Sequence, residues 1–233
     1  MSKLDDLAVI SRHIGTNLDL VQGAGGNTSV KQDDVLWIKA SGCWLKDAGS
    51  RNIFVPVDYP GIVKDLARND DESVTPKILQ LGEGTSLRPS IETSLHALMP
   101  HRYVVHVHSV NTIANAVLDD GKKRMARLLD GVSWSWVPYV RPGIPLTRAV
   151  QRVMHLGLNV LILANHGLVL GADSKEEIFD LLDDLESRLS CPRREPIVAD
   201  GNKILSLVAN TDYQPSKYPL VQSLAFDPVA LSI

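Results

Sequence analysis

Cysteines, long apolar runs and an apolar leader are scarce in this sequence or missing from it. The two cysteines, Cys43 and Cys191, lie in unrelated contexts and in no C-x-x-C pair, so we interpret both as packing residues in a reducing compartment. No apolar run approaches the ~20 residues that span a bilayer, and the first residues lack the hydrophobic core of a signal peptide. These absences predict a soluble, cytoplasmic protein.

The sequence also has no excess of basic residues, with 24 Lys and Arg against 27 Asp and Glu. The formal net charge is -3 and the pI is about 6.1, whereas general nucleic-acid or anionic-membrane surfaces need a basic excess. The basic cluster Lys122-Lys123-Arg124, with Arg127, has the pattern of a solvated helix face. We therefore expect neither a nucleic acid nor a membrane as a partner.

Apolar residues, by contrast, are plentiful enough to build a sizeable core. The chain has 233 residues, of which 44% are hydrophobic and 22% charged, as in ordinary globular proteins. This length suits one large α/β domain better than two small ones. We predict a single domain over residues 1–233, in which residues 191–233 form a C-terminal extension.

Apolar periodicity divides the chain into helices and strands. Helices are expected at residues 4–18, from 59 onward, and at 91–99, 110–118, 122–129, 146–155 and 174–190. Strands are expected at 28–31, 35–40, 53–57, 103–108, 134–140, 160–164 and 167–170. These strands outnumber the helical crossovers that an all-parallel sheet requires. We therefore predict an α/β fold with a largely antiparallel sheet flanked by helices.

The segments at residues 22–27 and 69–89 are too rich in glycine or polar residues for regular structure, and we expect loops there. The Gly23-x-Gly25 spacing hints at a dinucleotide-binding fingerprint. That interpretation fails, because position 28 is Thr and a strand, not a helix, follows.

The C-terminal segment Tyr218–Ile233 carries more apolar surface than a free tail tolerates. Its apolar residues are Leu220, Val221, Leu224, Phe226, Val229 and Leu231. We expect this segment to pack on the domain or on a neighbouring subunit.

Two histidines, His106 and His108, stand two residues apart in an expected strand. Such residues project from the same face, so both imidazoles can reach one metal ion, while Val105 and Val107 point to the opposite layer. By itself a His-x-His pattern is weak, because this spacing often arises by chance.

A third histidine, His166, lies between two apolar runs, where one expected strand ends and the next begins. An imidazole there is costly unless its nitrogens have partners, which a core hydrogen-bond network or a metal shared with His106 and His108 would provide. Three ligands with an open fourth position are typical of a catalytic metal site. The remaining histidines fit ordinary surface or packing roles: His13, His96, His101 and His155.

Four motifs together resemble the class II aldolase/adducin family. They are Gly25-Gly26-Asn27-Thr28-Ser29, Pro89-Ser90-Ile91-Glu92, His106-x-His108 and Asn165-His166-Gly167, with matching order and spacing over residues 5–190. Residues 88–93 and 136–143 are most similar to the aldolase domain of bifunctional rhamnulose-phosphate aldolase/lactaldehyde dehydrogenase proteins. The dehydrogenase domain is missing from this chain, so its substrate can differ from that of the bifunctional proteins.

The resemblance implies a three-layer α/β/α sandwich and a metal-dependent carbon–carbon lyase. Such an aldolase cleaves a ketose or ketose phosphate, with the metal as the Lewis acid that stabilises an enediolate. One divalent ion per chain, most simply Zn²⁺ with Mn²⁺, Co²⁺ or Ni²⁺ as alternatives, would be bound by His106, His108 and His166. Because family members often form four-fold rings with active sites between subunits, we expect a homotetramer.

The resemblance also assigns roles to individual residues. Glu92 matches the family's acid/base carboxylate, although a glutamate in the first turn of a helix is common for electrostatic reasons alone. Substrate phosphate or hydroxyl groups would be bound by Asn27, Ser41, Gly42 and Ser90. The simpler alternative is that the glycines make a turn and Ser90 caps a helix.

Three further points qualify this assignment. Tyr139 and Arg141 lie in a proline-bounded segment that could contact substrate across a subunit boundary, or could be a packed aromatic and a surface charge. Ala24 and Ile91 stand where phosphate-using aldolases carry hydroxyl side chains. Decarboxylase, dehydratase or epimerase chemistry stays an alternative, as does a non-catalytic adducin-like interaction module, although such modules typically lose the metal histidines.

Overall fold

A computed structural model describes residues 2–68, 74–81, 86–193, 200–212, 214–218 and 221–222. The chain divides into two compact units, Met1–Cys191 and Pro192–Ile233. In the described residues no helix is both long and apolar enough to cross a membrane.

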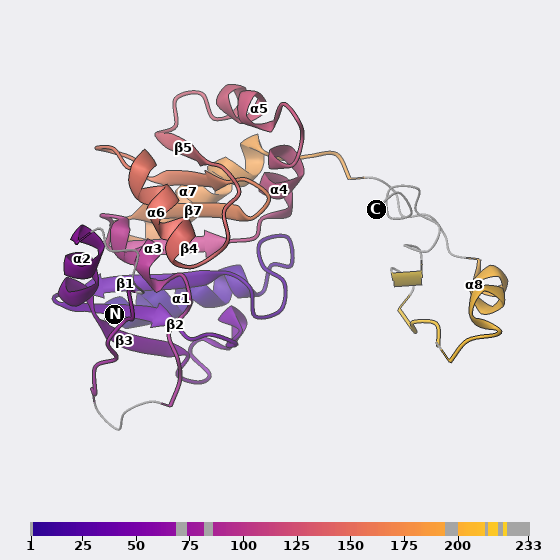
Figure 1. Cartoon of the computed structure of the whole chain (residues 1–233), viewed down its shortest axis with the longest axis horizontal. Coiled ribbons are helices and arrows are strands. Elements are labelled where there is room, and N and C mark those ends of the chain that lie inside the picture. The colour runs from indigo at the N-terminus through magenta and orange to yellow at the C-terminus, as the bar shows by residue number, and fades with distance from the viewer. Residues whose placement is uncertain are drawn as a thin grey trace. The chain divides into compact units, whose positions relative to one another are not determined.

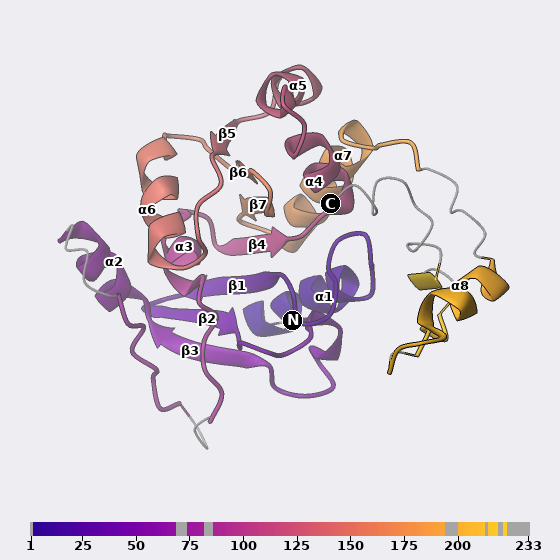
Figure 2. The same cartoon turned by 45° about the vertical axis from the view of Figure 1, so that its right-hand side comes forward.

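A seven-stranded sheet forms the centre of the first unit (Figure 1, Figure 2). Its strands are β1 (Asn27–Gln32), β2 (Val35–Lys39), β3 (Phe54–Asp58), β4 (Tyr103–Val107), β5 (Trp134–Val137), β6 (Val160–Leu163) and β7 (Gly167–Ala172). They lie in the order β3-β2-β1-β4-β7-β6-β5. Each neighbouring pair is antiparallel except β5 and β6, which run parallel. The predicted, largely antiparallel sheet is therefore confirmed.

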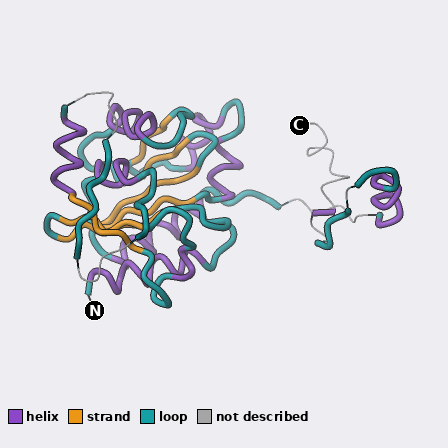
Figure 3. Tube along the Cα trace, turned by 60° about the horizontal axis from the view of Figure 1, so that its bottom comes forward, coloured by secondary structure: helices purple, strands orange, loops and turns teal. Residues whose placement is uncertain are grey.

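Helices cover both faces of the sheet and complete a three-layer α/β/α sandwich (Figure 3). One face carries α1 (Lys3–Gly15), α4 (Val110–Ala116), α5 (Gly121–Leu128) and α7 (Lys175–Arg188). The other carries α2 (Tyr59–Ala67), α3 (Thr93–Leu98) and α6 (Ile144–Val153). A short 3₁₀ helix, η1 (Leu45–Asp47), packs beside α1.

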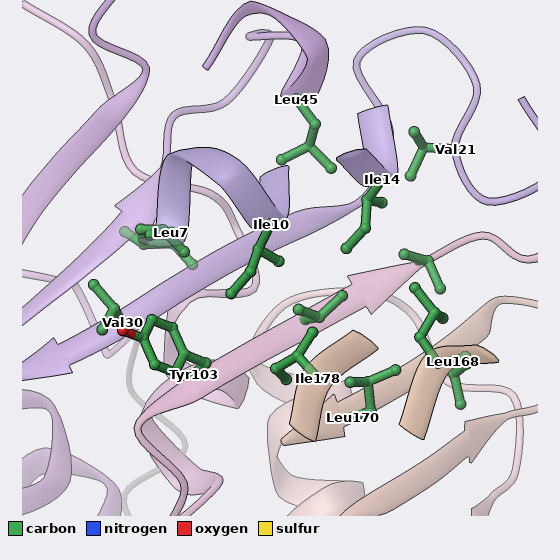
Figure 4. Packing of buried hydrophobic residues seen from close by; sticks show 14 of the residues in the cluster. Leu7, Ile10, Ile14, Val21, Val30, Leu45, Tyr103, Leu168, Leu170 and Ile178 are labelled. Atoms are coloured by element: carbon green, nitrogen blue, oxygen red, sulfur yellow. The ribbon is translucent and has the colours of Figure 1, made fainter. Parts of the chain in front are cut away.

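Two apolar clusters hold these layers together. The larger joins α1 and α7 to the sheet and is drawn in Figure 4. Its labelled members are Leu7, Ile10, Ile14, Val21, Val30, Leu45, Tyr103, Leu168, Leu170 and Ile178. The smaller cluster joins α3 and α6 to the opposite face. Side chains of β4 alternate between the two: Val105 and Val107 belong to the larger cluster and Val104 to the smaller.

Local signals explain where the long helices begin. Ser2 and Ser174 each form a capping box at the start of α1 and α7. The serine hydroxyl accepts from the backbone amide of the third helical residue, Asp5 or Glu177. The carboxylate of that residue accepts in turn from the backbone amide of the serine. These bonds satisfy amide groups that a helix start leaves without partners. The β1–β2 hairpin turns at Asp33, whose φ of 54° is in the left-handed region that aspartate tolerates.

The second unit contains α8 (Gly201–Val208), which begins after Asp200, whose carboxylate accepts from the amides of Asn202 and Lys203. This helix was not predicted from the sequence. The apolar C-terminal segment lies mostly outside the described residues, so its packing stays a prediction.

Candidate metal centre and substrate pocket

His106 is the most constrained of the three clustered histidines. It lies on β4 and shares the face of Val104, with 1% of its surface exposed. Its Nδ1 lies 3.0 Å from the Leu168 carbonyl oxygen on β7. Because a carbonyl oxygen can only accept, Nδ1 carries the proton and the lone pair is on Nε2. The neighbouring strand thus fixes both the ring and its tautomer.

The other two rings come from the ends of neighbouring strands. His108 follows β4 by one residue, and His166 lies in the tight turn between β6 and β7. In that turn Asn165 has a φ of 52°, which its short polar side chain tolerates. Gly167 comes next, and a methyl group there would lie 2.2 Å from the Val107 carbonyl oxygen. The Asn-His-Gly sequence is therefore what lets the turn approach the end of β4.

The three imidazoles form one cluster. One ring nitrogen from each lies within 4.8 Å of the others, and the ring centroids are 4.8, 5.0 and 5.3 Å apart. Nitrogens bound at ~2.0–2.1 Å to a tetrahedral ion are roughly 3.4 Å apart. Small rotations of the half-buried rings of His108 and His166 would close that difference.

The chemistry of the cluster fits a divalent cation. His106 Nε2 and His166 Nδ1 are buried and have no hydrogen-bond partner among the described residues, a costly state that a bound ion would relieve. Burial lowers the pKa of His106, His108 and His166 to about 4 each. All three are therefore neutral near pH 7, the form in which imidazole binds metal.

A buried carboxylate, Glu92, faces this cluster from the residue before α3. Its Oε2 accepts from Asn27 Nδ2 at 2.6 Å and lies 3.5 Å from His106 Nε2, while Oε1 lies 3.5 Å from His166 Nε2. Burial raises the pKa of Glu92 above its ordinary value. Its side chain makes no capping hydrogen bond to α3.

An open pocket of about 240 Å³ leads to Glu92, His108 and His166. Its lining includes all four residues predicted to bind substrate: Asn27, Ser41, Gly42 and Ser90. The segment after β2, which carries Ser41 and Gly42, meets the segment before α3, which carries Ser90. The Ser41 amide donates to the Arg88 carbonyl at 2.9 Å, and the Ser90 amide donates to the Lys39 carbonyl at 3.3 Å.

Ser90 also supports the loop that carries Glu92. Its hydroxyl accepts from the Glu92 amide at 3.2 Å. The N-cap of α3 is Glu92 and not Ser90, so Ser90 supports the turn before that helix and also lies in the pocket wall. Ala24 and Ile91, the two departures from the hydroxyl pattern, line the pocket as well.

One pocket residue escaped the sequence analysis. Lys39, the last residue of β2, is 2% exposed and lines the pocket. Its Nζ donates to the carbonyl oxygens of Ala24 at 2.8 Å and Cys43 at 2.6 Å. The usable signal was a lysine at the buried end of an alternating strand, followed after Ala40 by Ser41-Gly42.

Tyr139 and Arg141 do not join this pocket within one chain. Tyr139 is 63% exposed, and Arg141 is exposed as well. The pocket wall instead includes the adjacent Pro142. A substrate contact by either residue would have to come from conformational change or from a second subunit.

A larger hollow, of about 540 Å³, lies along α7 and the end of β7. Acidic side chains line it, among them Asp173, Glu177, Asp180 and Asp184, beside His101. Within the described part of the chain, the histidine cluster and not this hollow brings three metal-binding side chains together.

Known proteins resemble the chain in both sequence and fold. "Uncharacterized oxidoreductase YuxG" of Bacillus subtilis is 29% identical over 189 residues, which are 76% of this chain and 27% of that protein. The chain thus spans 27% of the length of that curated relative.

Among solved structures, the N-terminal class II aldolase domain of a conserved protein from Thermoplasma acidophilum has a TM-score of 0.70 and 29% identity, covering 81% of this chain and 92% of that one. A sugar-phosphate aldolase from Thermotoga maritima has a TM-score of 0.58 and 16% identity, covering 91% and 97%; this likeness concerns the fold. The family model described as the Class II Aldolase and Adducin N-terminal domain matches residues 5–191. The chain belongs to the class II aldolase and adducin N-terminal domain family.

Proposed function

We propose that this protein is a divalent-metal-dependent lyase of the aldolase type, which cleaves the bond between the α- and β-carbons, counted from the carbonyl, of a ketose or ketose phosphate. The observation that supports it most is the carboxylate of Glu92, buried 3.5 Å from ring nitrogens of both His106 and His166. A metal centre with a carboxylic acid beside it, at the end of an open pocket, is suited to proton transfer at carbon.

His106, His108 and His166 would hold the ion, with Zn²⁺ favoured by three neutral nitrogen donors and an open fourth position. When bound, the cation supplies Lewis acidity, stabilising the negative charge that develops on the substrate's oxygen atoms during cleavage.

Glu92 would move the proton. Asn27 engages Oε2, which fixes the carboxyl group, while Oε1 is buried without a hydrogen-bond partner among the described residues. In cleavage, Glu92 delivers a proton to the carbon that has lost the aldehyde. In synthesis, it removes a proton from that same carbon. Burial raises the pKa of Glu92 above its ordinary value, the direction that favours the acid form needed for this dual role.

Asn27, Ser41, Gly42 and Ser90 would bind the polar end of the substrate. Hydroxyl and amide side chains donate hydrogen bonds, and the glycine lets backbone N–H groups approach an anion.

The direct test follows hydrogen exchange at the hydroxymethyl carbon of dihydroxyacetone phosphate in D₂O, with zinc-reconstituted protein. Exchange that requires metal and is lost in Glu92→Gln supports the proposal. Failure of the fully metal-loaded wild type to exchange either dihydroxyacetone phosphate or dihydroxyacetone would contradict it.

Decarboxylation, dehydration or epimerisation is the second candidate, favoured by Ala24 and Ile91 in the pocket wall. These side chains cannot donate to a phosphate as hydroxyls would. Product analysis with sugar acids and sugar phosphates separates these reactions from aldol cleavage. A hydride-transfer activity, suggested by the printed name of the Bacillus subtilis relative, finds no support in residues 23–28, which lead into β1 and not into a helix.

An adducin-like interaction module is disfavoured for a different reason. Such a protein has no use for three neutral histidines beside a buried carboxylate, because burying these groups costs stability.

A further inference from the structure

His96 is a buried histidine that belongs neither to the histidine cluster nor to the pocket wall. It lies on α3 with none of its surface exposed. Its Nδ1 lies 2.8 Å from the hydroxyl oxygen of Ser29 on β1, whereas its Nε2 has no hydrogen-bond partner among the described residues. Because an unsatisfied buried nitrogen costs stability, an apolar side chain would fill this space at a lower cost. The polar pair therefore calls for a role that an apolar contact cannot perform.

The Ser29–His96 hydrogen bond runs beside the hydrogen bond between Asn27 and Glu92, whose length is 2.6 Å. Asn27 and Ser29 are two residues apart on β1, so they project from the same face of the strand. Glu92 and His96 are four residues apart, and the His96 amide donates to the Glu92 carbonyl at 3.2 Å, which places them one turn apart on one side of the helix. All four side chains are buried. Two parallel hydrogen bonds thus join the start of α3 to β1.

The remaining anchors of α3 are apolar. Leu95 and Met99 pack in the smaller apolar cluster, and a helix of six residues has little stability of its own. Apolar contacts are non-directional, so they tolerate small shifts of the helix along the sheet. A hydrogen bond weakens steeply when its distance and angle change. The polar pair is therefore the contact that can fix where α3 lies along β1.

We propose that Ser29 and His96 are positioning residues for Glu92, because their hydrogen bond sets the place of α3 along β1 and so holds the carboxylate between His106 and His166. The carboxylate oxygens lie 3.5 Å from ring nitrogens of both histidines, and a shift of the helix would change both distances together. A misplacement of about 1 Å can lower a rate roughly a hundredfold. This inference rests on the proposed function, because it concerns the acid/base group of that reaction.

The test separates positioning from stability. Ser29→Ala leaves both ring nitrogens of His96 without partners and should lower the unfolding midpoint. Combining Ser29→Ala with His96→Leu removes both polar groups and keeps a side chain of similar size, so the midpoint should largely return. If the pair had only a structural role, turnover would return with it.

We expect turnover not to return. Hydrogen exchange at dihydroxyacetone phosphate, followed with zinc-loaded full-length protein, should lose about tenfold to a hundredfold in kcat in both variants. KM should change little, because the side chains of Ser41 and Ser90 stay in the pocket wall.

The side-chain amide of Asn27 gives a second readout that requires no substrate. Its Nδ2 donates to Glu92 Oε2, and a short hydrogen bond to a carboxylate shifts the amide proton resonance downfield. In protein labelled with ¹⁵N-asparagine, this resonance should move upfield in Ser29→Ala and in the double variant. Such a change reports directly on the place of the carboxylate.

The matched control is Ser11→Ala. The Ser11 hydroxyl oxygen, on α1, lies 2.6 Å from that of Thr28, and both residues are fully buried. Thr28 precedes Ser29 on β1 and points to the opposite face, so this hydrogen bond joins a different helix to the same strand. Ser11→Ala should lower the unfolding midpoint but leave kcat and the Asn27 resonance unchanged. Zinc content measured in every variant verifies that the metal site persists.

The double variant decides the proposal. Native exchange together with a native Asn27 resonance in that variant overturns it, and so do losses in Ser11→Ala as large as those in Ser29→Ala. If the double variant does not fold, Ser29→Ala, which removes a single oxygen atom, is judged alone. A shifted Asn27 resonance then supports the positioning role, and an unchanged resonance refutes it.

Failure of the proposed function looks different. In that case zinc-loaded wild type exchanges no substrate proton, whereas the Asn27 resonance still moves in Ser29→Ala.

Discussion

At the scale of single residues, the candidate site depends on the hydrogen bonds that position the histidines and Glu92 as much as on those groups themselves. The Leu168 carbonyl fixes the tautomer of His106, and Asn27 fixes one oxygen of Glu92. Both supports come from strands adjacent to β4 in the sheet. The reactive groups can therefore be held in place before any substrate binds, which is how protein sites avoid the cost of reorganisation.

We predict that His166→Ala abolishes stable binding of a divalent ion. The wild type should retain about one ion per chain, because three neutral imidazoles leave a single open position. Elemental analysis after dialysis measures the ratio, and His155→Ala, at an exposed histidine outside the cluster, is the control. Equal metal content in both variants would remove His166 from the ligand set.

Glu92→Gln should separate metal binding from turnover. The amide has nearly the shape of the carboxylate but cannot take up a proton, so we expect full metal occupancy and a loss of at least about a hundredfold in kcat. Steady-state kinetics and elemental analysis on the same sample measure both quantities. Native proton exchange by the variant would assign the acid/base role to another group.

The sequence indicated the site residues unevenly. The His-x-His spacing follows from strand geometry, so its prediction needed only the location of β4. The Asn27–Glu92 hydrogen bond could not be predicted, because it depends on which segments the topology brings together. Asn27 and Glu92 are 65 residues apart in the chain, and no local pattern encodes that contact.

At the scale of elements, the glycine-rich loop is shaped by steric limits that differ from one glycine to the next. Gly23 and Gly26 both have positive φ angles, of 58° and 67°. A methyl group at Gly23 would meet no atom within 4 Å, but at Gly26 it would lie 2.6 Å from Val21 Cγ1 and 2.9 Å from the His106 carbonyl oxygen.

We therefore predict that Gly26→Ala is clearly more destabilising than Gly23→Ala. Both should lose about 1–2 kcal/mol for the left-handed backbone, and Gly26→Ala should lose more because the loop must move away from β4. Urea unfolding measures the difference. Equal losses would mean that the loop shifts freely, and the position of Asn27 would then not depend on Gly26.

The β1–β2 hairpin also contains a largely buried lysine, Lys31. Burial lowers its pKa to about 7, against an attraction from Asp173 that raises it. Its ordinary pKa is near 10.5, so between these values the unfolded chain binds more protons than the folded one. The free energy of unfolding should therefore rise with pH between about 7 and 10.5.

Lys31→Gln should flatten this rise by up to about 1.4 kcal/mol per pH unit, the slope for one proton. Chemical unfolding at several pH values measures it. Lys39 contributes in the same direction above pH 8, so some slope should persist in the variant. Parallel profiles for wild type and Lys31→Gln would show that Lys31 stays protonated when folded.

The elements themselves were largely predictable, and the exceptions have physical reasons. The long helices begin at capping boxes and the strands at changes of periodicity, which are local signals. The parallel pairing of β5 with β6 is not local, since α6 connects the two strands. The helix α8 was not predicted because eight residues give only about two turns of pattern to recognise, although the segment is amphipathic and Asp200 caps it.

At the scale of the whole molecule, several large apolar side chains of the first unit are exposed to solvent. Val110, Val117 and Leu118, on and just after α4, are 47%, 53% and 45% exposed, and Tyr139 is 63% exposed. Single exposed apolar residues are common, but adjacent ones are typical of surfaces that become buried on assembly.

We predict a closed homo-oligomer, most simply a tetramer, with Tyr139 or Arg141 of one subunit near the pocket of another. Light scattering at micromolar concentration measures the mass, and Val117→Asp should reduce it by placing a charge in the interface. Lys122→Asp, on the exposed face of α5, is the control and should keep the wild-type mass.

If the pocket is completed between subunits, Val117→Asp should also lower kcat/KM while zinc content stays at one per chain. A monomeric wild type would contradict the prediction, and a monomeric Val117→Asp with native kcat/KM would confine substrate binding to one chain.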